Sequence, residues 1–308
     1  MAGKDFLEPS SATLPYKGAG KRSRLTPSSE KQTVKADSVD TFAANRAVGR
    51  LALAVAGASG ESRRKRVHEA GSLRVRFPNG TSKGTLDAVI VNTAGGMTGG
   101  DRFDIDMTVG AGARLTVTTA AAEKIYRSLG PNTHVGVKAD VGSGGALAWL
   151  PQETILFDQV RLRRTIDIEL ARDARLVLAE AIVFGRSAMG EAVLRGYLFD
   201  RWRVRVGGAL VFAETLRLDG AIAQMLAQRA IAAESVAIAS VLKIPGDDAG
   251  VTAVRAIEKD FAGEVGVSAW NGLAVVRLVA ADGAALRRDL IGVLTALGAG
   301  PLPRLWMN

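Results

Sequence analysis

The chain has 308 residues, of which 47% are hydrophobic, enough to bury a core as one large domain or two small ones. Its formal net charge of +9 favours an acidic partner, and the absence of cysteine excludes disulfides, thiolate metal sites and cysteine nucleophiles. No apolar run reaches the roughly 18 residues of a membrane span, and the polar N-terminus is unlike a secretory signal. We therefore expect a soluble, cytoplasmic protein.

The first part of the chain predicts a disordered leader followed by many strands. Residues 1–45 combine prolines with polar residues and show no sustained apolar period. The basic run Arg63–Arg66, flanked by Glu61 and Glu69, favours a solvated loop over a nucleic-acid patch. A turn is expected at Pro78-Asn79-Gly80. Short alternating or apolar runs predict strands at residues 50–56, 73–77, 85–91, 103–107, 115–119, 135–141, 147–150, 154–157, 165–170, 175–184, 201–206 and 210–218.

The most distinctive stretch is Val91–Ser128, which opens with two glycine pairs, Gly95-Gly96 and Gly99-Gly100. A phosphate-binding loop of the Walker type would need a lysine after the last glycine, but Asp101 stands there. A dinucleotide-binding loop would lead into a helix, whereas a strand pattern follows. We therefore interpret the glycines as tight turns that allow close chain approach.

The last ninety or so residues differ in character. Residues 221–235 are ambiguous and residues 236–244 are compatible with a strand. Helical spacing at residues 251–261 and 284–297 encloses strands at 264–270 and 273–280. We expect a single domain over residues 46–308, with a β body (46–220) and a helix–strand–strand–helix lobe (221–308) packed on it. The fold class is mainly β, and stacked strands would give it a solenoid-like layer.

The sequence contains few groups able to perform chemistry. The two histidines, His68 and His134, lie far apart and form no metal-binding pair, so a nitrogen-rich metal site is not expected. There is no GxSxG nucleophile motif. Aromatic residues make up only 5% of the chain and offer few stacking platforms for sugars or bases. A carboxylate-dependent hydrolytic β protein and a basic nucleic-acid-binding module remain as alternative hypotheses.

Several acids are candidate site residues. Glu180 interrupts an apolar run, where a charge is costly unless it is paired, and Arg186 is the expected partner. A structural ion pair is as good an interpretation as a functional one. Asp101 and Glu153 are more typical of carboxylates that cap turns.

Five ordered segments resemble the urease accessory protein family UreD, also called UreH. They are NTAGGMTGGD (Asn92–Asp101), TTAAAEKIYRS (Thr118–Ser128), LAWLPQETILFD (Leu147–Asp158), FGRSAMGE (Phe184–Glu191) and PRLW (Pro303–Trp306). One departure is Ala120, where the family pattern leads us to expect glutamine, so a polar contact of that side chain is missing. The resemblance spans most of the chain after the leader.

The resemblance implies a mainly β, layered and superhelical fold with few helices, and an assembly factor rather than an enzyme. Family members bind apo-urease and, with UreF and the GTPase UreG, load nickel; UreG would be reached through UreF. Neither a nucleic-acid nor a membrane partner is expected. No tightly bound cofactor is expected, because nickel prefers imidazole and thiolate ligands, so nickel would only be in transit. Candidate acids for a weak nickel path are Asp101, Glu153, Glu180 and Glu191. Candidate interface or structural residues are Lys124, Tyr126, Arg127 and Arg186.

Overall fold

Two β-sheets form the framework of the part of the chain that the computed structural model describes, residues 45–78, 83–186 and 189–307. One sheet has seven strands, in the order β14 (Ala209–Gly220), β13 (Gly196–Val206), β11 (Val160–Leu170), β8 (Thr133–Val141), β5 (Arg102–Val109), β1 (Val48–Ala58) and β2 (Glu61–Gly71). The other has ten, in the order β16 (Glu264–Trp270), β17 (Leu273–Ala280), β15 (Ala237–Ile244), β12 (Arg175–Phe184), β9 (Ala146–Trp149), β6 (Arg114–Thr119), β4 (Thr85–Asn92) and β3 (Leu73–Arg76), while β10 (Thr154–Leu156) pairs with β12 and with β7 (Glu123–Ile125).

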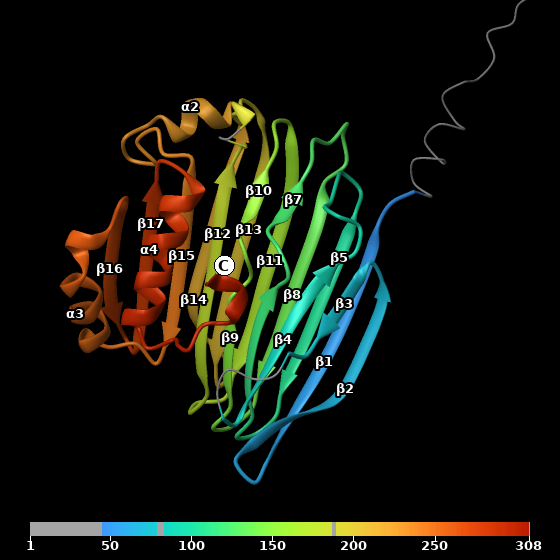
Figure 1. Ribbon diagram of the computed structural model, residues 1–308, viewed down its shortest axis with the longest axis vertical. Helices are drawn as coiled ribbons and strands as arrows, with labels where there is room; N and C mark the ends of the chain where they lie inside the picture. Colours follow the sequence, from blue (N-terminus) through green and yellow to red (C-terminus); the bar gives the residue numbers. More distant parts are fainter. Residues whose placement is uncertain (1–44, 79–82, 187–188, 308) are drawn as a thin grey trace, which may run out of the picture. The chain divides into compact units, whose positions relative to one another are not determined.

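The chain passes back and forth between the two sheets as it stacks its strands. In the seven-stranded sheet β1, β5, β8, β11 and β13 pair in parallel, and in the ten-stranded sheet β4, β6, β9 and β12 do the same. Antiparallel strands flank both parallel stacks, as Figure 1 shows. This repeated coil confirms the predicted mainly β, solenoid-like fold with few helices.

The larger core lies between the sheets and is formed by the side chains that alternate toward it along each strand. In β11 every second side chain is buried, as in Leu162, Ile166 and Ile168. These side chains join Leu147 and Leu178 of the ten-stranded sheet in one apolar cluster. Because successive side chains point to opposite faces of a strand, alternation in the sequence becomes one buried face and one solvated face.

A second core lies between the ten-stranded sheet and two helices, α3 (Asp248–Ala256) and α4 (Gly283–Ala296). Figure 1 shows α4 over β15 and β17. Leu286, Leu290 and Val293 of α4 pack in this cluster with residues of the sheet. Asp247 and Asp282 begin the helices, each accepting a hydrogen bond from a backbone amide three residues on, at 2.9 and 2.8 Å respectively. None of the described helices is long and apolar enough to cross a membrane.

Most predicted elements are confirmed, with a few corrections. The predicted helix at 284–297 is α4 to within one residue, whereas the one at 251–261 ends at Ala256 and is followed by a 3-10 turn, η2 (Glu258–Asp260). The ambiguous region contains a short helix, α2 (Ile222–Leu226). The expected loop at Arg63–Arg66 is wrong, because these residues belong to the edge strand β2. The predicted leader, except Asn45, and most of the turn at 78–80 lie outside the described residues.

Trp306, close to the last described residue, packs and hydrogen-bonds against the ten-stranded sheet. Trp306, in the 3-10 turn η3 (Arg304–Trp306), is only 1% exposed. Its Nε1 donates to the carbonyl of Leu150 at 3.0 Å and to Oγ1 of Thr118 at 3.2 Å. The guanidinium of Arg287 lies 5.3 Å from the ring centroid.

Trp306→Ala should lower the free energy of unfolding by about 3–5 kcal/mol, because it removes a fully buried ring and leaves a cavity. Urea unfolding measures this. Trp270→Ala is the matched control, since Trp270 is 44% exposed, and should cost less than about 1 kcal/mol. Equal losses in the two variants would contradict the structural role given to η3.

Candidate functional site

Four of the sequence segments singled out above meet at one place in the structure. Strand β10 pairs in parallel with β7 on one side and with the end of β12 on the other. Met97, in the glycine-rich loop after β4, forms a parallel bridge with Ile125 of β7. The loop after β12 begins at Gly185, whose amide donates to the carbonyl of Leu156 at 2.8 Å. Segments far apart in the sequence are therefore direct neighbours.

The glycine pairs allow this close packing. A Cβ atom on Gly96, whose φ is +144°, would lie 2.5 Å from the ring of Tyr126, and one on Gly99 would lie 1.9 Å from Oγ of Ser128. Asp101 accepts hydrogen bonds from the amides of Ala47 at 2.9 Å and Thr98 at 2.8 Å. These contacts agree with the interpretation of the glycines as close turns and of Asp101 as a turn-capping carboxylate.

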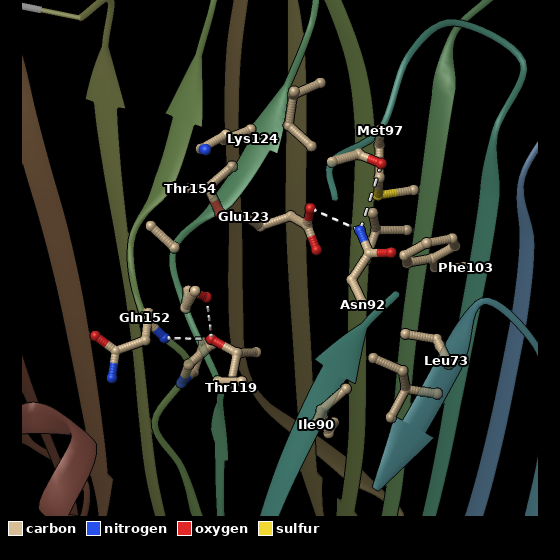
Figure 2. A pocket seen from close by; sticks show the side chains of 18 of the residues that line it. Leu73, Ile90, Asn92, Met97, Phe103, Thr119, Glu123, Lys124, Gln152 and Thr154 are labelled. Atoms are coloured by element: carbon tan, nitrogen blue, oxygen red, sulfur yellow. Dashed lines mark hydrogen bonds between the residues drawn. The ribbon is translucent and has the colours of Figure 1, made fainter. Parts of the chain in front are cut away.

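A cavity of about 310 Å³ lies beside these segments, between the two sheets. Figure 2 shows its apolar wall and the polar side chains that face it from β4, β6, β7 and β10. The apolar lining includes Leu73, Ile90, Met97, Phe103, Ile105, Ile125, Val135, Val137 and Leu162. The polar lining consists of Asn92, Thr119, Glu123, Gln152, Thr154, Arg164 and Glu180, together with the indole of Trp149; Lys124 also borders the cavity but is exposed to solvent.

Glu123 is the cavity acid with the fewest partners. Its Oε1 accepts one side-chain hydrogen bond, from Nδ2 of Asn92 at 2.9 Å (Figure 2). Burial raises the pKa of Glu123 to about 7, although the hydrogen bonds from Asn92 and from the backbone of Lys124 lower it. The carboxyl group can therefore gain or lose a proton near neutral pH. Glu123 is not among the candidate acids predicted from the sequence.

Glu180 belongs to a buried charge network at the wall of the cavity. Arg164 donates to Glu180 and, through Nε, to Oδ1 of Asp200 at 3.1 Å. Nη1 of Arg164 also contacts Oγ1 of Thr154 at 3.3 Å, and Nε1 of Trp149 donates to Oε1 of Glu180 at 2.8 Å. The three charged residues are each at most 5% exposed. Apolar residues surround this polar network, and its members act as hydrogen-bond donors and acceptors for one another.

The network fixes the charge state of its arginine. Burial alone would lower the pKa of Arg164, but the charges of Asp200 and Glu180 hold it above its ordinary value, so the guanidinium stays charged. Burial raises the pKa of Glu180 to about 7, while the charge of Arg164 acts to lower it. Glu180 is thus held by an arginine and an indole, in contrast to Glu123.

The partner predicted for Glu180 is wrong. Arg186 lies on the surface and pairs with Glu191, while Glu180 pairs with Arg164 from the opposite sheet. Sequence proximity misled the prediction, because the true partner lies 16 residues upstream, on the preceding strand, which faces β12 across the core. A usable signal was present: Arg164 lies in step with Ile166 on the buried face of β11.

The other candidate acids do not line the cavity. Glu153 pairs with Arg287 at 2.8 Å, and Glu191 forms the surface pair with Arg186. Both His68 and His134 are exposed on strands of the seven-stranded sheet. Within residues 45–78, 83–186 and 189–307, no three His, Asp or Glu side chains gather in a way that could hold a metal ion. The roles proposed for these acids on a nickel path stay predictions.

Comparison with known proteins identifies the family. The family model described as "UreD urease accessory protein" matches residues 47–307. The chain belongs to this family. It is 56% identical over 268 residues to the urease accessory protein UreD of Rhodopseudomonas palustris strain CGA009, covering 87% of this chain and 96% of the relative. The UreD protein of strain HaA2 is 54% identical over 277 residues, covering 90% of this chain and 99% of the relative. That of Bradyrhizobium diazoefficiens is 52% identical over 267 residues, covering 87% and 96%.

Removing the Glu180 carboxylate should be strongly destabilising. Glu180→Ala leaves the buried charge of Arg164 only partly compensated, at a cost of about 3–5 kcal/mol in the free energy of unfolding. The control Glu191→Ala breaks an exposed pair and should cost less than about 1 kcal/mol. Urea unfolding of both variants checks the difference, and equal costs would show that the buried network does not contribute as described.

Glu123 should make stability depend on pH. Its pKa is about 7 in the folded protein and 4.5 ordinarily, so between these values the folded state holds a proton that the unfolded state has released. Stability therefore falls as pH rises through this window. From about pH 5 to about pH 8, the wild type should lose on the order of 2 kcal/mol more than Glu123→Gln. Urea unfolding at both pH values measures this; identical pH profiles would contradict it, and Glu191→Gln serves as the control.

Proposed function

We propose that this protein is a non-enzymatic assembly factor that docks on apo-urease and, with UreF and UreG, supports delivery of nickel to the urease metallocentre. Membership of the UreD family supports a role in urease assembly. The observation that carries the proposal further is the convergence of the family-like segments on one cavity, where burial raises the pKa of Glu123 and of Glu180 to about 7.

The donor set of the cavity fits a cation in passage better than a stored one. Nickel binds imidazole and thiolate most strongly. The chain has no cysteine, and neither histidine lines the cavity. Oxygen donors are present instead, on Asn92, Glu123 and Glu180. A carboxyl group must lose its proton to bind a metal, so a pKa near 7 lets Glu123 bind weakly and release readily.

The buried network gives the cavity wall a fixed charge pattern. The permanent positive charge of Arg164 is offset by Glu180 and Asp200, so it does not repel a cation as an unpaired guanidinium would. Glu123, which has one side-chain donor among the described residues, is then the carboxylate best able to approach a passing cation. The family assignment favours this role over the hydrolytic and nucleic-acid alternatives.

The proposal is tested by urease activation in cells that lack this protein. Wild type, Glu123→Gln and the control Glu258→Gln, at an exposed residue of η2 that does not line the cavity, are restored separately, and urease activity, urease nickel content and pull-down of apo-urease are measured. Deletion should abolish activation. Glu123→Gln should lower the nickel content while pull-down stays intact, because only the titrating carboxylate is lost; the control should behave as wild type.

Two other outcomes would change the conclusion. If deletion left the nickel content of urease unchanged, the assembly role would fall. If Glu123→Gln activated urease as well as wild type, the cavity would have no part in nickel delivery, although the assembly role would stand.

A further inference from the structure

Exposed apolar side chains gather in three loops that follow β7, β10 and β12. Leu129 is 80% exposed, Met189 72%, Leu194 59% and Tyr126 37%. Single exposed apolar residues are ordinary, but several on adjoining loops indicate a contact surface. We call this the Phe157 surface, defined as Tyr126, Leu129, Phe157, Arg186, Met189 and Leu194.

Backbone hydrogen bonds hold the three loops together. The amide of Ser128 donates to the carbonyl of Gln159 at 3.0 Å, and the amide of Gln159 donates to the carbonyl of Arg195 at 2.9 Å. The amide of Arg195 in turn donates to Oδ1 of Asp158 at 3.0 Å. Leu129 follows Ser128 and Leu194 precedes Arg195, so these hydrogen bonds hold in place the backbone that carries both exposed leucines. Such order lowers the entropic cost of binding a partner.

An aromatic cluster lies at the centre of this surface. The ring of Phe157 meets the ring of Tyr126 edge-on at 4.8 Å between centroids, and the guanidinium of Arg186 lies 4.4 Å from the Phe157 centroid. Arg186 is held by its ion pair with Glu191, and the hydroxyl of Tyr126 donates to the carbonyl of Gly95 at 3.2 Å. Tyrosine and arginine are the residue types that most often anchor protein interfaces.

The charges around this cluster indicate which kind of partner would bind. Lys124, Arg127 and Arg195 are exposed and lie outside the ion pairs formed among the described residues. The nearby carboxylates of Asp158 and Glu191 are already engaged, with the amide of Arg195 and with Arg186. A second copy of this chain would bring a net charge of +9 and the same cations, so self-association is disfavoured and an acidic partner is favoured.

We propose that the Phe157 surface is a docking site for a protein partner whose contact face carries carboxylates around apolar side chains. The inference rests on the proposed function, because the partner belongs to urease assembly, and goes beyond it by naming the surface and the partner's chemistry. Lys124 and Gly95, which adjoin Tyr126, also line the cavity. A partner seated on this surface therefore sits against the cavity lining.

The test measures binding of the full-length protein to two separate probes, purified apo-urease and purified UreF. Leu129→Glu should weaken binding to one of them by about tenfold or more, because it removes an apolar contact and adds a charge that an acidic face repels. Leu129→Lys should weaken it less. Leu210 is the matched control, at 50% exposure outside the surface; its Glu and Lys variants should stay within about twofold of wild type.

Three results would overturn the inference. The first is that Leu129→Glu binds both probes as the Leu210 variants do. The second is that Leu129→Lys weakens binding as much as Leu129→Glu. The third is that the wild type is self-associated in solution and Leu129→Glu is monomeric. Urease activation separates these failures from failure of the proposed function. If deletion abolishes activation but Leu129→Glu neither weakens binding nor lowers activation, only the docking surface is wrong. If deletion leaves activation unchanged and wild type binds neither probe, both fall.

Discussion

The charge of the arginine buried between the two sheets constrains which side chains can lie next to it and the register of the strands that carry them. Arg164 comes from β11 of one sheet, Glu180 from β12 of the other and Asp200 from β13 of the first. A guanidinium keeps its charge, so it is tolerated in an apolar core only where carboxylates meet it. A slip of either strand by one residue would turn these side chains to the opposite face. The network thus specifies register, and apolar packing supplies the stability.

That network also explains why the two glutamates of the cavity differ. Both oxygens of Glu180 are occupied, one by Trp149 and the other by Arg164, so its carboxylate is a fixed part of the wall. Glu123 is held by Asn92 and by backbone at the end of a three-residue strand. Burial acts on both, but among the described residues only Glu123 has a carboxylate oxygen that accepts no side-chain hydrogen bond. In the proposed function, the less constrained carboxylate is therefore the one that would meet a passing cation.

The sequence predicted elements best where apolar runs or alternation mark a face that is at least partly buried. The boundaries of β12, β16 and β17 match the expected ranges for this reason. Strand β2 was missed because it is an edge strand with solvent on both faces from Arg63 to His68, so no period marks it. At the site, the buried charge of Glu180 was predicted but its partner was missed; the alternation of β11 places Arg164 on a buried face, yet only the fold shows that it meets Glu180 across the core.

Because side chains alternate along a strand, the cavity and the Phe157 surface lie on opposite faces of the same segment. In β7 and the residue after it, Glu123 and Ile125 point toward the core side, whereas Lys124 and Tyr126 are exposed. The loop at Met97 is bonded to this strand in both directions, donating to the carbonyl of Lys124 and accepting from the amide of Tyr126, each at 2.8 Å. Glu123, which faces the cavity, and Tyr126, which belongs to the Phe157 surface, are therefore only three residues apart on one hydrogen-bonded stretch of backbone. The cavity and the surface proposed for docking thus share β7 as a common structural element.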